Sequence, residues 1–196
     1  MSTLQKLLIS IGKIIYFLEA KKKSLIHLYL QEKYYSRAKM IGKCVQFNGH
    51  SYIGNIEKVE IGDNVHIGDN AYISAKGGLY IGDNTHISRN LLLYTDNHNY
   101  EGEVLPYDDT FILKKVTIEK NVWMGMNVTI LPGTYIEEGA IIGAGSVVSG
   151  RVKKYSIVGA SLAKEFSKRD KNHYDKLEKE KQYGGKNGQR IQKDCM

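Results

Sequence analysis

A six-residue unit written twice in succession constrains this chain more than any other feature. It reads IGDNVH from Ile61 to His66 and IGDNAY from Ile67 to Tyr72. One large aliphatic residue in every six places supplies one line of a core, and Gly and Asn tolerate the positive φ that a tight turn needs. A helix requires apolar residues three and four positions apart, and Gly-Asp-Asn at this spacing would interrupt it. The repeat therefore predicts short strands separated by turns.

Related units flank this pair on both sides. They begin at Ile41, Phe47, Ile53, Ile81, Ile87, Met124, Ile130, Ile136, Ile142 and Val148. A single unit cannot bury its apolar face alone, so neighbouring units must stack around a continuous core. We therefore expect an all-β solenoid. An ordinary β-sandwich of short strands is the alternative, and a strict six-residue repeat disfavours it.

These units resemble the hexapeptide repeat of the left-handed β-helix acyltransferases, and in particular the saccharide O-acetyltransferases. The resemblance covers roughly residues 41–166, and its most specific part is residues 122–150, VWMGMNVTILPGTYIEEGAIIGAGSVVSG. It implies a left-handed parallel β-helix. It also implies a homotrimer, in which three subunits pack side by side and acetyl-CoA binds between two neighbouring subunits.

Segments of a different character flank the repeats. Residues 1–40 form a helical segment: apolar residues recur three and four apart over residues 4–18, and residues 24–40 suggest a second helix. The β-helix domain then spans residues 41–161. Its periodicity fails in an inserted loop, residues 94–116, and loops of this length often carry function. Residues 162–196 predict a C-terminal helix and a polar tail that we expect to be disordered.

The positive charge is concentrated at the two ends of the chain. The net charge is +7, yet residues 41–161 carry ten Lys or Arg against thirteen Asp or Glu. Residues 1–40 carry eight against two, and residues 162–196 carry ten against six. A basic surface on the coils is therefore absent from the sequence, which argues against nucleic acid as a partner.

The N-terminal helical segment allows two interpretations. Its apolar residues are followed by Lys21, Lys22 and Lys23, the composition of a helix that lies on a membrane surface. Packing against the open end of the solenoid is the alternative, and both can hold together.

Residues 4–18 are too short to span a bilayer and lack a signal-peptide cleavage site. The two cysteines are Cys44, within the repeats, and Cys195, the penultimate residue, and a pair at these positions is a poor disulfide framework. We therefore expect a cytoplasmic protein, with the inner face of the membrane as the site of any lipid contact.

His98 is the candidate catalytic residue. It lies in the inserted loop in the run YTDNHNY, residues 94–100. In the resembling family a histidine in such a loop is the general base. An imidazole suits that role near neutral pH, because it can take the proton of a hydroxyl that attacks a thioester and return it to the leaving thiolate. Asp96, Asn97 and Glu101 are the candidates to orient the ring. Tyr94, Asn97 and Tyr100 are candidates to contact the substrate.

The cofactor positions rest on the resemblance. Trp123 matches the family's aromatic position beside the acceptor and the cofactor, and Ala144 matches the position that approaches pantetheine. The chain departs from the family at Gly150, where a lysine commonly meets the CoA phosphates, so Arg151, Lys153, Lys154 and Lys164 are the candidates to supply that charge. The full set of candidate cofactor-binding residues is Trp123, Gly125, Met126, Ala144, Ser149 and Lys164, with Trp123 also a substrate candidate.

His66 and His86 raise a metal hypothesis together with His98, since one branch of the same fold holds zinc with three histidines. That branch places two ligands close together in the loop, and His98 has no histidine nearby in the sequence. We therefore expect no metal.

The resemblance implies transfer of acetyl from acetyl-CoA to a hydroxyl of a saccharide, such as a capsule, an O-antigen, another cell-surface glycan or a precursor. An amino-sugar N-acetyltransferase is one alternative. A metal-dependent hydratase and a non-enzymatic solenoid scaffold are alternatives of another class. The acceptor sugar cannot be identified from these residues.

Overall fold

The computed structural model describes residues 1–103 and 106–159 together with residues 172, 175, 176, 179 and 180. One compact unit spans Met1–Ala160. The predicted C-terminal helix and tail, residues 162–196, lie outside the described residues apart from those five positions, and so does the candidate Lys164.

Three parallel sheets form the wall of the molecule. The first contains β1 (Met40–Ile41), β4 (Val59–Ile61), β7 (Leu79–Ile81), β12 (Val116–Ile118), β15 (Tyr135–Ile136) and β18 (Arg151–Val152). The second contains β2 (Gln46–Phe47), β5 (His66–Ile67), β8 (His86–Ile87), β13 (Trp123–Met124), β16 (Ile141–Ile142) and β19 (Ile157–Val158). The third contains β3 (Tyr52–Gly54), β6 (Tyr72–Ser74), β9 (Leu92–Tyr94), β14 (Thr129–Ile130) and β17 (Val147–Val148).

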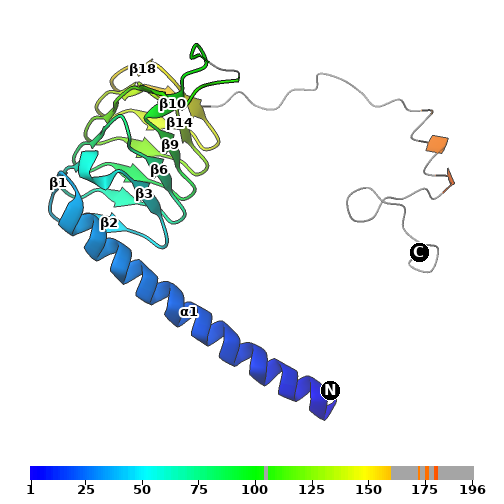
Figure 1. The fold of residues 1–196 in the computed structure, drawn as a ribbon. Helices are drawn as coiled ribbons and strands as arrows, with labels where there is room; N and C mark the ends of the chain where they lie inside the picture. Colours follow the sequence, from blue (N-terminus) through cyan, green and yellow to red (C-terminus); the bar gives the residue numbers. More distant parts are fainter. Residues whose placement is uncertain (104–105, 160–171, 173–174, 177–178, 181–196) are drawn as a thin grey trace. The chain divides into compact units, whose positions relative to one another are not determined.

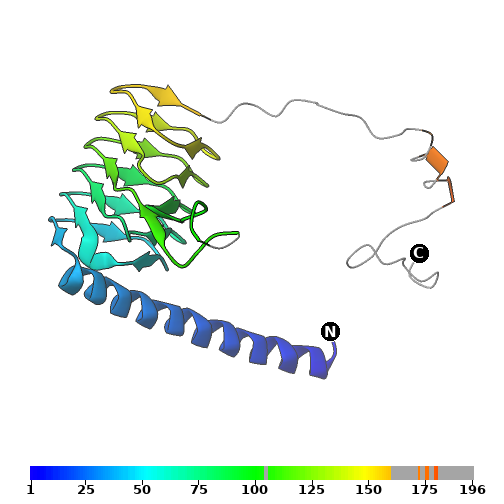
Figure 2. The ribbon, with the colours of Figure 1, turned by 45° about the horizontal axis from the view of Figure 1, so that its top comes forward.

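The chain visits these sheets in rotation, and Figures 1 and 2 show the resulting coils stacked one above another. The described residues complete five coils and carry a sixth through β18 and β19. Each strand bonds to the strand one coil earlier and one coil later, always in parallel. The predicted left-handed parallel β-helix is thus confirmed.

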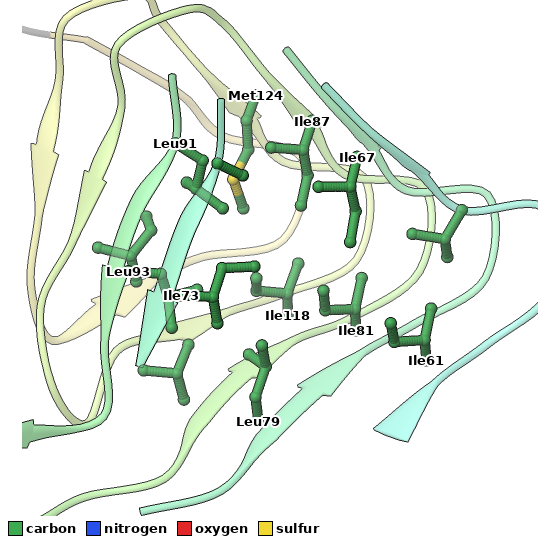
Figure 3. Close-up of a cluster of buried hydrophobic side chains, with 14 of the residues drawn as sticks. Ile61, Ile67, Ile73, Leu79, Ile81, Ile87, Leu91, Leu93, Ile118 and Met124 are labelled. Atoms are coloured by element: carbon green, nitrogen blue, oxygen red, sulfur yellow. The ribbon is translucent and has the colours of Figure 1, made fainter. Parts of the chain in front are cut away.

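The six-residue spacing works by placing one aliphatic side chain of each unit inside the prism, directly above its counterpart in the previous coil. In the first sheet Ile61, Ile81, Ile118 and Ile136 are in register, and all are fully buried. The second sheet aligns Ile67, Ile87 and Met124, and the third aligns Ile73, Leu93 and Ile130. Figure 3 shows several of these side chains converging on one interior. The core is therefore a set of columns that run along the solenoid.

The Asp-Asn pairs of the repeat form the corners. The Asn residues adopt left-handed backbone, with φ of 53° at Asn64 and 62° at Asn90. This conformation costs most residues about 1–2 kcal/mol, and Asn tolerates it. Their side chains also bond from coil to coil: the Asn90 amide accepts from Asn70 at 3.1 Å and donates to Asn127 at 2.8 Å. The repeat therefore specifies the turns as well as the core.

A single helix, α1 (Thr3–Arg37), precedes the coils. The prediction of two separate helices was wrong, because the residues between them, Glu19 to Ser24, include no Gly or Pro to interrupt the helix. Ser2 and Gln5 form a capping box at its start. Within the described residues no helix has the length and apolar character needed to cross a bilayer.

The last turns of α1 cover the first coil. Tyr34 is 2% exposed, its hydroxyl donates to the Ser51 carbonyl at 2.9 Å, and the Ile53 N–H donates to it at 3.1 Å. The Tyr35 hydroxyl donates to the Val45 carbonyl at 2.6 Å. These bonds satisfy backbone groups that an open coil would expose. This end of α1 therefore acts as a cap, one of the two roles expected for the segment.

An antiparallel hairpin leaves the third coil directly after β9. It consists of β10 (Asp96–His98) and β11 (Phe111–Leu113), with His98 opposite Phe111. The coils resume at β12. A short 3-10 turn, η1 (Ile56–Lys58), lies between β3 and β4, at the same corner of the prism as the hairpin but two coils earlier.

Candidate functional site

The β10–β11 hairpin holds His98 between aromatic rings. The ring centroids of His98 and Tyr107 are 4.0 Å apart with planes inclined by 22°, and the Phe111 centroid lies 4.7 Å from that of His98. The Lys76 ammonium sits 3.0 Å from the centre of the opposite-strand ring, that of Phe111. Stacking of this kind limits rotation of the imidazole without occupying either ring nitrogen.

No hydrogen bond reaches the His98 ring from any described residue. Two of the three candidates for orienting it have side chains engaged elsewhere: the Ser74 hydroxyl donates to Asp96 at 2.6 Å, and the Asn97 side-chain oxygen accepts the backbone N–H of His98 at 3.0 Å. The third, Glu101, donates its backbone N–H to Asn99. In this isolated chain the ring is therefore positioned by Tyr107 and Phe111, and both nitrogens can meet a substrate.

Hydrogen bonds within the hairpin tip hold it in shape. The Asp108 carboxylate accepts from the Thr110 hydroxyl and backbone N–H and from the Glu103 N–H. The Thr110 hydroxyl and backbone N–H, followed by the Glu103 N–H, hold the pKa of the Asp108 carboxyl below its usual value. This local network explains why an exposed hairpin keeps Tyr107 close to His98.

A pocket of about 280 Å³ opens at His98. Its lining is Tyr94, Asp96, Asn97, His98, Phe111, Leu131 and Pro132. The structure thus brings together four of the sequence-predicted residues, Tyr94, Asp96, Asn97 and His98. Tyr100 is 61% exposed and does not line the pocket. Sequence reasoning missed Tyr107 and Phe111, because the pairing that places Phe111 opposite His98 exists only in the folded hairpin.

The cofactor candidates gather at another place. Trp123 is 56% exposed on β13 and lines a pocket of about 320 Å³ with Asn84, His86 and Asn121. On the neighbouring strand β8, His86 is paired in register with Trp123. The His86 ring also stacks on the His66 ring, with the ring centroids 4.3 Å apart. The next residues along the chain lead into the corner between the second and third sheets.

Three cofactor candidates meet at this corner. A Cβ atom added to Gly125 would lie 2.6 Å from the Ala144 nitrogen, so Gly125 lets two neighbouring coils approach closely. The Gly145 N–H donates to the Met126 carbonyl at 2.8 Å. Gly125, Met126 and Ala144 therefore form one continuous surface, with the Met126 side chain 49% exposed on it.

Ser149 lies at the following corner, in a groove of about 450 Å³ that also includes Arg151 and Lys153. Two of the basic candidates here are already paired: Arg151 donates to Glu137, and the Lys154 ammonium lies 2.9 Å from Glu138. The Glu138 carboxylate raises the pKa of Lys154 above its usual value. Among the described residues, Lys153 has neither an ion pair nor a side-chain hydrogen bond, so it is the cation that remains available.

The His98 group and the Trp123 group occupy different faces of the prism. His98 projects from the end of the third sheet, whereas Trp123 lies on the second sheet. No pocket formed by the described residues contains both side chains. One copy of the chain therefore presents two separate half-sites.

Two further features belong to neither half-site. A hollow of about 680 Å³ lies where α1 meets the early coils and contains none of the predicted site residues; Lys23, His27, His50 and Arg89 are part of its lining. Across the described residues, no three His, Cys, Asp or Glu side chains converge as they would around a metal ion.

Two family models match the coils. The model described as hexapeptide repeat of succinyl-transferase matches residues 58–95, and the model described as bacterial transferase hexapeptide (six repeats) matches residues 115–150. The unmatched residues between them are those of the hairpin.

Among curated relatives, WbbJ of Escherichia coli K12, a candidate lipopolysaccharide biosynthesis O-acetyltransferase by its name, is 32% identical over 134 residues. That alignment covers 68% of this chain and 61% of WbbJ, so the chain spans less than two thirds of this relative. A galactoside O-acetyltransferase of the same organism is 38% identical over 64 residues, 31% of this chain and 32% of that enzyme.

Solved structures share the fold. A hexapeptide-repeat acetyltransferase from Vibrio cholerae superposes with a TM-score of 0.60 at 26% identity, over 65% of this chain and 72% of that one. The same protein has been crystallised with acetyl-CoA. AntD, an N-acyltransferase from Bacillus cereus, gives a TM-score of 0.56 at 21% identity over 76% of this chain and 94% of its own, in a complex with dTDP-4-amino-4,6-dideoxyglucose and CoA.

Proposed function

The chain belongs to the hexapeptide-repeat family of bacterial transferases, and from this premise we propose that it moves an acetyl group from acetyl-CoA to a hydroxyl of a saccharide. The observation that carries the proposal is His98, stacked between Tyr107 and Phe111 with both ring nitrogens unbonded at the mouth of a pocket. Such a ring can accept a proton from a group that enters the pocket.

The reaction proceeds by direct transfer. One nitrogen of His98 takes the hydroxyl proton as the oxygen attacks the thioester carbonyl, which forms a C–O bond. The C–S bond then breaks, and the imidazolium returns the proton to the CoA thiolate. The acetyl-CoA arm is held by Trp123, Gly125, Met126 and Ala144. The family commonly has a lysine at the position of Gly150, and here Lys153 provides the positive charge for a CoA phosphate instead.

The separation of the two half-sites favours a homotrimer. His98 on one copy and Trp123 on its neighbour can face each other across a cleft, whereas within one copy they lie on different sheets. The active site would then form only between subunits. The lipopolysaccharide role in the name of WbbJ supports a cell-surface glycan or its precursor, such as an O-antigen or a capsule, as the proposed acceptor. Our proposal includes a cytoplasmic location for the enzyme.

An amino-sugar N-acyltransferase is the second candidate. The fold similarity to AntD, which extends over 94% of that chain, favours it. The two candidates differ in the acceptor atom, so matched acceptors decide between them: one sugar with a hydroxyl and the same sugar with an amine at the acceptor position.

The first test is release of free thiol from acetyl-CoA with a panel of bacterial glycans. We compare the wild type with His98→Ala and with His50→Ala, a histidine on the coils that lines the hollow beside α1. Removal of a general base costs about 10²–10⁴-fold in rate. We expect glycan-dependent release that falls by at least about a hundredfold in His98→Ala and stays unchanged in His50→Ala.

Unchanged release in His98→Ala would remove His98 from the mechanism and keep the transferase class. Failure to bind CoA at all would contradict the class itself and favour a scaffold.

A further inference from the structure

Apolar side chains of α1 remain exposed from its start to Tyr29. Within α1, thirteen large apolar residues before Leu30 are between 45% and 77% exposed. These are Leu4, Leu7, Leu8, Ile9, Ile11, Ile14, Ile15, Tyr16, Phe17, Leu18, Leu25, Leu28 and Tyr29. Only Tyr34, near the other end of the helix, is buried against the coils. Soluble proteins usually expose large apolar residues singly, whereas here they form one extended surface.

The apolar residues are arranged for a flat, wide contact. Leu4, Leu8, Ile11, Ile15 and Leu18 follow the spacing of three and four that places side chains on one side of a helix. Leu7 and Ile14 extend that side. Lys6 and Lys13 occupy the opposite side, where their long stems can carry the charge out of an apolar layer.

The charge of this segment has one sign. Residues 1–31 contain five lysines and one acid, Glu19. Three of the lysines, Lys21, Lys22 and Lys23, follow the apolar turns immediately, whereas residues 41–161 carry more acids than bases. The helix is thus complementary to a negatively charged surface, and the coils are not.

We propose that α1 binds in the plane of an anionic lipid bilayer, with Leu4, Leu8, Ile11, Ile15 and Leu18 below the headgroups and Lys21–Lys23 at their level. No described helix can span a bilayer, so the helix lies along the surface. Tyr34 and Tyr35 join the helix to the first coil, and α1 thereby tethers the coils to the membrane. This inference does not depend on the proposed acetyl transfer.

A second copy of the chain is the alternative occupant, and one feature disfavours it. Lys22 continues the row of Leu4, Ile15 and Leu18, where a helix pair would need an apolar residue.

The test is flotation of the full-length protein with vesicles of phosphatidylcholine alone or mixed with phosphatidylglycerol. Leu8→Glu/Ile15→Glu places two charges on the apolar side. The control Ile9→Glu/Tyr16→Glu adds the same two charges, also seven residues apart, on the side that carries Lys6 and Lys13. We expect wild type and control to bind the anionic vesicles, and the Leu8/Ile15 variant to bind at least about tenfold less. Raising the salt concentration should weaken wild-type binding, because it screens the lysines.

Lack of wild-type binding to anionic vesicles would overturn the proposal, and so would equal binding by the Leu8/Ile15 variant. Sedimentation velocity separates the alternative occupant: if that variant only lowers the oligomeric state in lipid-free buffer and leaves vesicle binding intact, α1 packs against other copies. The thermal transition of the coils measures folding independently, and we expect it to be the same in all variants because the altered residues precede the part of α1 that contacts the first coil.

Discussion

Gly125 illustrates how a single residue serves fold and site together. It lies one coil below Ala144, and the space between them admits no side chain: an added Cβ atom would stand 2.6 Å from the Ala144 nitrogen and 2.8 Å from its Cα. The exposed Met126 follows directly. Loss of the close approach would therefore disturb the surface proposed to hold acetyl-CoA.

We predict that Gly125→Ala lowers the free energy of unfolding by about 1–3 kcal/mol, the range typical of overpacking. The matched control is Gly159→Ala, because an added Cβ atom there has no neighbour within 4 Å. Urea denaturation measures both variants. A control as unstable as Gly125→Ala would show that the effect belongs to any Gly-to-Ala change in these coils, and not to the contact with Ala144.

At the scale of elements, ion pairs join the last coils. Glu137, which follows β15, accepts from the Lys154 N–H at 2.7 Å and from Arg151 on β18. The Lys154 N–H and then the Arg151 guanidinium hold the pKa of the Glu137 carboxyl below its usual 4.5. These contacts fasten the sixth coil, which has no coil above it among the described residues.

We predict that this fastening depends on pH. Because the pKa of Glu137 is lower in the folded state, its contribution is complete above about pH 4.5 and is lost as the pH falls through the folded value. Wild type should therefore be more stable than Glu137→Gln at pH 7, and the two should converge in acid. Asp109→Asn is the control, an exposed acid with no hydrogen bond or ion pair in the described structure. Thermal unfolding across pH 7 to 3 measures the difference, and a gap that persists in acid would contradict the assignment.

At the scale of the whole molecule, the two half-sites matter most. His98 and Trp123 line separate pockets on different faces, so one chain does not assemble the proposed site. A trimer can complete the site, since the hairpin of one subunit extends away from its own coils.

We predict that two inactive variants restore each other. Mixed trimers of His98→Ala and Trp123→Ala subunits, purified through two different tags, should regain transfer activity, because some interfaces then combine an intact His98 with an intact Trp123. Mixing His98→Ala with the double variant His98→Ala/Trp123→Ala rebuilds no such interface and serves as the control. Activity that stays at the level of the control would place the whole site within one subunit.

Much of this molecule could be predicted from local pattern. The spacing of Ile61 and Ile67 predicted the coils, because the six-residue repeat acts through contacts between neighbouring coils. Asn64 and Asn90 lie at the corners because few residues accept the backbone conformation found there. The position of His98 in the break of the repeat was equally visible. The two-helix prediction failed because the residues between the two segments include Lys21, Lys22 and Lys23, and lysine is a good helix former that lets one helix continue through them.

The sequence by itself determined the coil, its core columns and its corners, since each depends on residues six places apart and on the coil directly above or below. Only the tertiary structure decided that Tyr107 and Phe111 stack on His98, that Asp96 accepts a hydrogen bond from Ser74, and that Lys153 has no ion pair with any described residue. Those contacts join residues through a hairpin and across coils, where no period governs the spacing and only the folded geometry sets which side chains meet.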